Sequence, residues 1–231
     1  MVDDVKKTVV ISVGGSLVVP EEIDTGFLRA FRDFALGYVG SYCNRLVLVC
    51  GGGRTCRSYN EAAKAVCDVA NDDLDWLGIM ATRLNAELLR CIMNGQAYDK
   101  VVRDPGEPIK TDRDIIISGG YTPGNSSDKV AVMLAKRFDS DSVINMTNVD
   151  MLYDKDPKRS RDARPIRKIK WDRFLEMFGH DWVPGTNVPF DPVASRLAKE
   201  SGIRVIILNG KDMPNLKRCV DGKDFTGTVI Y

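Results

Sequence analysis

The fold is decided by the stretch Ile115-Ile116-Ile117-Ser118-Gly119-Gly120-Tyr121-Thr122-Pro123-Gly124-Asn125-Ser126-Ser127-Asp128. Its apolar start predicts a strand, its glycine-rich middle a loop, and the following residues 129–138 a helix that begins at Ser-Ser-Asp. The first backbone N–H groups of a helix have no partner inside the helix, and the helix dipole favours negative charge there. The stretch therefore predicts a strand–loop–helix unit able to hold a phosphate.

Two further strands are followed by glycine loops. Gly14-Gly15-Ser16 comes after the apolar run 8–13, and Gly51-Gly52-Gly53-Arg54-x-x-Arg57 after the run 45–50. A Gly-Gly pair alone is also typical of ordinary tight turns. Arg54 and Arg57, by contrast, share one helix face beside free N–H groups, which favours an anion site over two solvated side chains. Three such loops predict a site for more than one phosphate group. Because neither Walker A nor G-x-G-x-x-G spacing occurs in these two loops, P-loop NTPases and Rossmann dehydrogenases are disfavoured.

Strand and helix patterns alternate along the whole chain. This alternation predicts an α/β fold with a mainly parallel sheet and helices on both faces, and sites in such folds lie beyond the carboxyl ends of the strands. The polar stretch around 154–164 is a candidate hinge between two lobes. Strands are expected at 8–13, 45–50, 115–118, 142–146, 204–208 and 228–231, and helices at 23–39, 54–69, 74–93, 128–138, 191–201 and 215–220.

Composition narrows the class of protein. The 231 residues carry 33 basic and 32 acidic side chains, so the net charge of +1 gives no support to a general nucleic-acid or membrane-surface role. No apolar run approaches the roughly 20 residues of a spanning helix, and the charged start does not resemble a signal peptide. Six cysteines show neither C-x-x-C pairs nor zinc spacing, which is typical of reduced thiols in a cytoplasmic protein.

Two polar clusters have alternative interpretations. Acidic residues at the start of the 74–93 helix, Asp75 among them, suit the helix dipole, and a carboxylate there can also accept hydrogen bonds from sugar hydroxyls. Thr147-Asn148-Val149-Asp150, with Tyr153 and Asp156 beyond it, is either a turn or the edge of a nucleotide site.

Two other features are weaker signals. The run 155–170 has eight basic and two acidic residues, and reads as a solvated loop face or a local contact for a triphosphate, without the aromatic residues of an RNA patch. His180, the single histidine, lacks a nucleophile context, so a structural role is favoured over a hydrolase triad.

Together these motifs resemble the amino-acid-kinase family and, within it, the archaeal-type uridylate (UMP) kinases, over almost the whole chain. The Asp75 block and the Pro-Gly loop point to that branch. The residues that carry the resemblance are Val13-Gly14-Gly15-Ser16, Gly51-Gly52-Gly53-Arg54-x-x-Arg57, Asp75-Trp76-Leu77-Gly78-Ile79, Arg83-x-Asn85-Ala86, Gly119-Gly120-x-x-Pro123-Gly124-x-Ser126-Ser127-Asp128, Thr147-Asn148-Val149-Asp150-x-x-Tyr153-x-x-Asp156-Pro157 and Asp191-Pro192-x-Ala194.

The resemblance implies a three-layer αβα sandwich, a single domain over 1–231 with an acceptor-binding lobe at about 1–140 and an ATP-binding lobe at about 141–231. It implies transfer of the γ-phosphoryl of ATP to UMP, giving UDP for pyrimidine nucleotide biosynthesis. Mg²⁺ would be held by the ATP phosphates, with no metal ligand expected from the protein. It also implies a cytoplasmic homo-oligomer, a hexamer, without nucleic-acid or membrane partners.

The resemblance also assigns residues. It implies that ATP contacts Ser12, Val13, Gly14, Gly15, Ser16, Gly53, Arg57, Thr147, Tyr153 and Asp156. It implies that UMP contacts Gly52, Asp75 through the ribose hydroxyls, and Tyr121, Thr122, Pro123, Gly124, Asn125, Ser126 and Ser127. Arg57, Arg54 and Asp128 are the expected catalytic residues, the first two by neutralising charge and Asp128 by orienting a lysine or the metal.

The sequence departs from the family pattern in three ways. Ser12 stands where many relatives have lysine, so the source of one positive charge is open, with Arg54, Lys129 and Lys155 as candidates. Ser126-Ser127 replaces Thr-Thr, and Met151 replaces a glycine. Two alternatives stay open. An isopentenyl phosphate kinase is disfavoured because no histidine lies near the first glycine loop, and a non-catalytic nucleotide- or oxyanion-binding storage protein is disfavoured by the intact Asp75 block.

Overall fold

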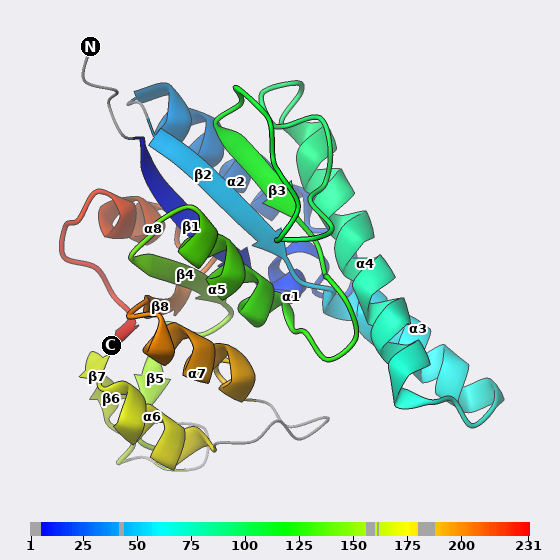
Figure 1. Ribbon diagram of the computed structural model, residues 1–231. Helices are drawn as coiled ribbons and strands as arrows, with labels where there is room; N and C mark the ends of the chain where they lie inside the picture. The colour runs from blue at the N-terminus through cyan, green and yellow to red at the C-terminus, as the bar shows by residue number, and fades with distance from the viewer. Residues whose placement is uncertain (1–5, 42–43, 156–159, 161, 180–187) are drawn as a thin grey trace.

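The computed structural model describes residues 6–41, 44–155, 160, 162–179 and 188–231. These residues form a seven-stranded sheet in the order β3-β2-β1-β4-β8-β9-β7 and a two-stranded sheet, β5-β6 (Figure 1). In the large sheet only the β8–β9 pair is antiparallel, which confirms a mainly parallel sheet. The strands are β1 (Lys7–Val13), β2 (Asn44–Cys50), β3 (Ile115–Ser118), β4 (Ser142–Thr147), β5 (Leu152–Tyr153), β6 (Pro165–Ile166), β7 (Lys168–Ile169), β8 (Arg204–Asn209) and β9 (Thr228–Ile230).

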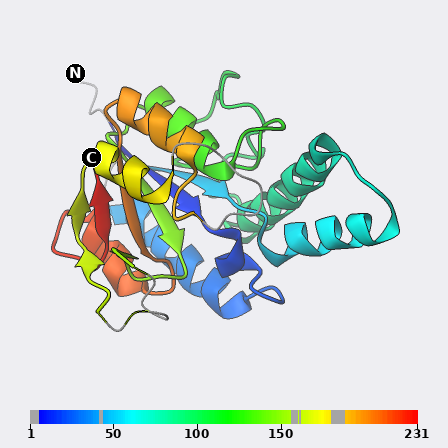
Figure 2. The ribbon, with the colours of Figure 1, turned by 90° about the horizontal axis from the view of Figure 1, so that it is seen from below.

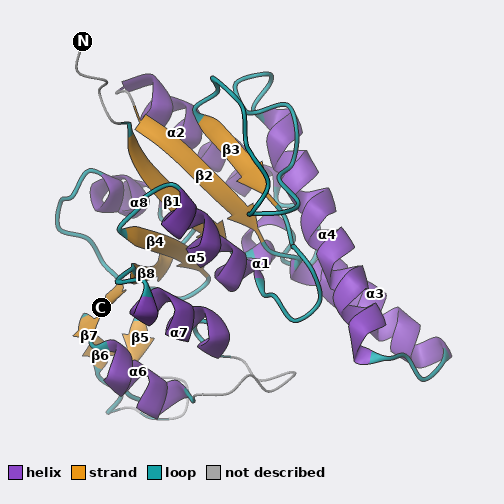
Figure 3. Ribbon diagram, in the orientation of Figure 1, coloured by secondary structure: helices purple, strands orange, loops and turns teal. Residues whose placement is uncertain are grey.

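Alternating side chains of the strands build two cores. In β1, Val9, Ile11 and Val13 belong to one hydrophobic cluster and Val10 to the other, because successive side chains point to opposite faces of a sheet. One cluster includes α2 (Thr25–Ser41), α4 (Asn71–Ile92) and α8 (Met213–Val220). The other includes α5 (Ser127–Arg137), α6 (Trp171–Phe178) and α7 (Pro192–Glu200). Helices therefore cover both faces, and the predicted three-layer αβα sandwich is confirmed (Figures 2 and 3).

Several elements were not predicted. The short helix α1 (Gly15–Val18) lies in a predicted glycine loop, and the two-residue strands β6 and β7 lie in the run interpreted as a loop face. The strand β5 and the helix α6 lie where no helix or strand was predicted. The candidate hinge at 154–164 joins β5 to β6, which pair with each other. The long helix begins at Asn71, earlier than predicted, so Asp72 and Asp73 lie in its first turn.

Helices α3 (Gly53–Val66) and α4 pack on one another and project from the body as an arm (Figures 1 and 2). None of the residues of α3 is buried. Trp76, Met80 and Leu84, spaced four residues apart on α4, are exposed. The arm is therefore anchored mainly where it joins the sheet. None of the helices in the described part of the chain combines the length and hydropathy needed to cross a lipid bilayer.

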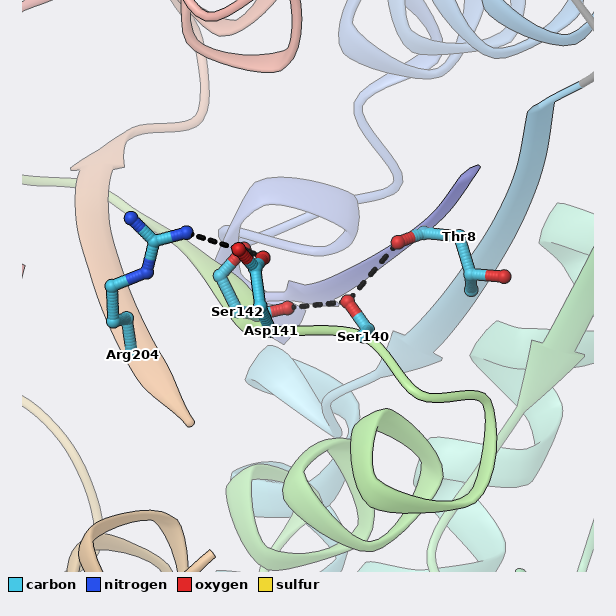
Figure 4. Close-up of polar contacts among 5 residues, drawn as sticks. All are labelled: Thr8, Ser140, Asp141, Ser142 and Arg204. Atoms are coloured by element: carbon cyan, nitrogen blue, oxygen red, sulfur yellow. Dashed lines mark hydrogen bonds and ion pairs between the residues drawn. The ribbon is translucent and has the colours of Figure 1, made fainter. Parts of the chain in front are cut away.

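Ser140 connects two strands at the end of the sheet opposite the glycine loops. Figure 4 shows its contacts. Its hydroxyl contacts the carbonyl oxygens of Thr8 at 3.1 Å and Ser142 at 2.9 Å, and the residue is 6% exposed. Close by, the side chain of Asp141 accepts hydrogen bonds from Ser142 and Arg204 at the surface. Ser140 therefore joins the start of β1 to the start of β4.

We expect Ser140→Ala to lower the free energy of unfolding by about 1–3 kcal/mol, because the part-buried carbonyl oxygens of Thr8 and Ser142 lose the buried hydroxyl as a partner. Ser142→Ala, which removes an exposed hydroxyl, is the control and should change it by less than about 0.5 kcal/mol. Urea titration measures both. Equal effects of the two substitutions would contradict the buried role of Ser140.

Candidate active site

The first two glycine loops interlock at the carboxyl edge of the sheet. Val13 and Cys50 pair at the ends of β1 and β2, so the loops that follow them start side by side. A Cβ added to Gly15 would lie 2.1 Å from the backbone nitrogen of Gly53 and 2.5 Å from the carbonyl carbon of Gly51. Gly53 has φ +59°, a conformation that glycine adopts without strain. Glycine is therefore required here for backbone-to-backbone contact.

Some of the backbone N–H groups of these loops are used internally and others are not. Gly14 donates to the carbonyl of Met146 at 3.0 Å, and Gly51 donates to the carbonyl of Val13 at 3.0 Å. Within the described residues, the amides of Gly15, Ser16, Gly52 and Gly53 donate to no protein acceptor. Since α1 and α3 begin at Gly15 and Gly53, two helix N-termini converge on one point. This arrangement suits an anion with several oxygens.

Helix α4 holds the second and third glycine loops together. The Asn85 amide donates to the carbonyls of Gly51 and Gly52, each at 3.0 Å. Thr82 accepts the N–H of Gly120 at 2.6 Å, and Arg83 donates to the carbonyl of Gly120 at 3.0 Å. Arg83 and Asn85 carried the resemblance without a role, and Thr82 was missed altogether. The sequence did contain a signal: Thr82 and Asn85 are three residues apart, so both polar side chains lie on one face of the helix.

A pocket of about 300 Å³ lies between α3, α4, α7 and the loop 120–127, and we call it the acceptor pocket. Asp75 lines it and accepts the N–H of Gly124 at 3.0 Å, so α4 also grips the tip of this loop. Tyr121 is half-buried and packs against the core, and neither it nor Gly52 lines the pocket. The residues that line it as predicted are Asp75, Thr122, Pro123, Gly124, Asn125, Ser126 and Ser127. Its other lining residues include four that carried the resemblance without a role, Gly78, Ile79, Gly120 and Asp191, and five that were missed, Cys56, Asn60, Leu74, Thr82 and Val193.

The candidate cationic side chains differ in their partners: two are paired with carboxylates and one with a hydroxyl. Arg57 is exposed and donates to the hydroxyl of Ser16 at 3.3 Å, so it reaches across to the first glycine loop. Arg54 lies 3.5 Å from Glu21 and 3.6 Å from Glu61, and Lys155 lies 2.5 Å from Asp162. Arg57 is therefore the arginine best placed to meet an anion held by the loop amides.

Asp128, in the first turn of α5, is hydrogen-bonded to two other elements of the fold. Its two carboxylate oxygens accept hydrogen bonds from the Ser12 hydroxyl at 3.2 Å and from the Asp191 N–H at 3.1 Å. Burial of the carboxyl raises the pKa of Asp128 to about 6; the hydrogen bond from the Asp191 amide opposes this, and the Asp191 charge adds to it. Asp191 in turn caps α7 by accepting the N–H of Ala194 at 2.7 Å. Asp128 therefore ties β1, α5 and α7 together, and its expected role of orienting a lysine or a metal is not among these contacts.

The raised pKa of Asp128 makes stability depend on pH. The native carboxyl keeps its proton up to about pH 6, whereas the unfolded chain loses it near pH 4, so stability falls as the pH rises between these values. The side chain cannot ionise in the variant Asp128→Asn. As the pH rises from about 4 to about 7, we therefore expect the free energy of unfolding of Asp128→Asn to increase by up to about 3 kcal/mol relative to that of the wild type. Urea titrations across that range measure the difference. A difference that does not change with pH would contradict it.

The strand ends on the far side of β1 carry the expected ATP edge. Thr147 accepts the N–H of Val149 at 3.2 Å in a tight turn, and Asn209 donates to the carboxylate of Asp150 at 2.8 Å. Gly210 follows β8, and a Cβ there would lie 2.1 Å from Leu17 of α1. Tyr153 is half-buried on β5, while Asp156 and His180 lie outside the described residues.

Comparison with known proteins gives the family. The sequence profile of the amino acid kinase family matches residues 7–209. The chain belongs to this family. Its relatives include a uridylate kinase of Methanothermobacter thermautotrophicus, 36% identical over 96% of this chain and 98% of the relative, and a uridylate kinase of Thermoplasma volcanium, 32% identical over 97% of each.

Solved structures agree with the family assignment. The uridylate kinase of Archaeoglobus fulgidus is similar with a TM-score of 0.82 and 31% identity, over 97% of this chain and 100% of that one. The UMP kinase of Ureaplasma parvum gives a TM-score of 0.76 at 20% identity, over 97% of this chain and 98% of that one, a likeness of fold alone.

Proposed function

We propose that this chain transfers the γ-phosphoryl group of ATP to UMP, giving ADP and UDP. The observation that carries the proposal is the placement of the acceptor pocket, lined by Asp75 and Ser126-Ser127, beside two interlocked glycine loops with free amides. The uridylate kinase relatives span nearly the whole chain, which supports UMP as the acceptor. No feature of the site favours isopentenyl phosphate or a storage role.

The residues would act by positioning and by neutralising charge. An oxygen of the UMP phosphate bonds to the γ-phosphorus while the bond from that phosphorus to the β–γ bridging oxygen breaks. The amides of Gly15, Ser16 and Gly53 and the guanidinium of Arg57 would hold the ATP phosphates, and Asp75 would accept hydrogen bonds from the ribose hydroxyls of UMP. Asp128 would act by fixing Ser12 and the start of α7.

Mg²⁺ would enter with ATP and add positive charge at the phosphates. In the described part of the chain, no three His, Cys, Asp or Glu side chains are arranged to hold a metal ion, and both oxygens of Asp128 already accept hydrogen bonds. We propose that the ion is held mainly by the ATP phosphates and by water. We further propose a cytoplasmic homohexamer that serves pyrimidine nucleotide biosynthesis, with acceptor and ATP lobes at about 1–140 and 141–231.

Turnover assays test this function. The purified protein with ATP and Mg²⁺ is offered UMP, CMP, dUMP and isopentenyl phosphate, and products are separated by anion exchange. We expect UDP from UMP at the highest kcat/KM. Turnover of isopentenyl phosphate without turnover of UMP would overturn the proposal, and nucleotide binding without any turnover would support a storage role instead.

A further inference from the structure

Asn145 is a buried amide in the otherwise apolar middle of β4. Its neighbours Val143, Ile144 and Met146 are buried hydrophobic residues, and Asn145 itself is 5% exposed. A carboxamide taken out of water is unfavourable unless it makes hydrogen bonds, so an aliphatic side chain would suit this strand better. The Nδ2 group of Asn145 donates to the carbonyl oxygen of Pro189 at 3.2 Å. This contact accounts for an amide at the position.

The contact holds the segment that leads into α7. We call Pro189, Phe190 and Asp191 the α7 entry, since Asp191 is the N-cap of that helix. Each of the three residues is attached to the body of the protein. Pro189 accepts the hydrogen bond from Asn145, the ring of Phe190 is 1% exposed in the core, and the N–H of Asp191 donates to Asp128 at 3.1 Å.

Two neighbouring strands supply the polar attachments. Asn145 of β4 pairs in register with Ser12 of β1. Each lies two residues after a valine of the same hydrophobic cluster, Val143 and Val10, so both side chains point to the face covered by α5 and α7. Ser12 donates to Asp128 at 3.2 Å. The α7 entry is therefore attached to β4 directly, through Asn145, and to β1 through Ser12 and Asp128.

The α7 entry forms one wall of the acceptor pocket. Asp191 and Val193, in the first turn of α7, both line the pocket. The carboxylate of Asp191 accepts the N–H of Ala194 at 2.7 Å, and its carbonyl accepts the hydroxyl of Ser195 at 2.8 Å, so the entry and the helix are joined. A displacement of the entry would therefore displace this wall.

We propose that Asn145 is a positioning residue for the acceptor, which it serves by fixing the α7 entry; this rests on the proposed function. Without the amide donor, the entry would hold its place in a smaller fraction of molecules, and the apparent affinity for UMP would fall by that fraction. The ATP edge has its own attachment. Thr147 pairs with Asn209 of β8, and its carbonyl accepts the N–H of Gly210 at 2.8 Å, both through the backbone.

The test measures the dissociation constants of UMP and of ATP separately, by calorimetric titration, in the wild type and in Asn145→Leu. Leucine keeps the branched shape of the side chain but has no donor. We expect the dissociation constant of UMP to rise about tenfold and that of ATP to change by less than about twofold. Asn145→Ala, a second variant without the donor, should give the same selectivity and replaces Asn145→Leu if leucine does not pack.

Ser140→Ala is the matched control for loss of stability. Ser140 precedes β4 at the opposite end of the strand, where its hydroxyl also contacts a backbone carbonyl. We expect this variant to be destabilised and to bind both nucleotides as the wild type does. A selective loss of UMP affinity in Ser140→Ala as well would assign the effect to general loosening and overturn the role of Asn145.

The outcomes separate this proposal from the function on which it rests. Absence of UMP turnover by the wild type would overturn the proposed function before any variant is compared. An active wild type whose affinity for UMP is unchanged in both Asn145 variants would overturn the positioning role alone. Equal losses of affinity for UMP and ATP would also overturn it, because the α7 entry borders the acceptor pocket.

Discussion

Gly15→Ala is expected to lower kcat at least about 100-fold and to destabilise the protein by about 3 kcal/mol or more. The added methyl group would lie 2.1 Å from the nitrogen of Gly53 and 2.6 Å from the carbonyl oxygen of Gly51, and neither backbone atom can rotate away. The two glycine loops would have to separate, which would move the amides that are proposed to hold the phosphates. Thermal unfolding should shift down by about 6–12 °C in a chain of this size.

Gly37→Ala is the control for this substitution. A Cβ at Gly37, within α2, meets nothing within 4 Å, and alanine is the better helix former. We expect it to leave kcat unchanged and to stabilise the protein by up to about 1 kcal/mol. If Gly15→Ala retained full activity and stability, the backbone contact between the loops would not be required.

Asp75→Asn is expected to raise the KM for UMP about 10–100-fold and the KM for ATP by less than about twofold. One oxygen of the side chain can still accept the N–H of Gly124, so the tip of the loop stays fixed. The other oxygen becomes an NH₂ group, which cannot accept a hydrogen bond from a ribose hydroxyl. Hydrogen bonds to charged groups contribute about 1.5–3 kcal/mol, and each 1.4 kcal/mol is tenfold in affinity.

Steady-state kinetics with each substrate varied in turn measure this selectivity. Asp73→Asn is the matched control, since Asp73 lies in the first turn of α4, is exposed and does not line the acceptor pocket. It should alter neither KM. Equal increases in both KM values for Asp75→Asn would remove Asp75 from the acceptor site.

The sequence predicted the α/β architecture because its strands and helices have strong, separate periodicities. It missed β5, β6 and β7 because a strand of two residues is defined by its partner, not by its own pattern. It gave no prediction for α6, although Trp171, Phe174 and Leu175 are buried with helical spacing, because eight residues make only about two turns of such a pattern.

The candidate site was predicted in part. Glycine loops after strands could be recognised because the pattern lies in neighbouring residues. The contact between Gly15 and Gly53 could not, because it joins residues 38 positions apart. The same limit applies to Asp128, whose partners Ser12 and Asp191 lie on other elements. Such contacts depend on how the sheet brings its strand ends together, and no local pattern contains that information.

Helix α4 sets a fixed distance between the second and third glycine loops. Thr82 and Arg83 hold the third glycine loop and Asn85 holds the second, so the residues that hold the two loops lie within three positions of one another on the helix, a rise of at most about 4.5 Å. The rise of a helix is nearly constant, because backbone hydrogen bonds hold each turn to the next. The distance between these two loops is therefore set by the rise of a helix and not by the length of a flexible connection.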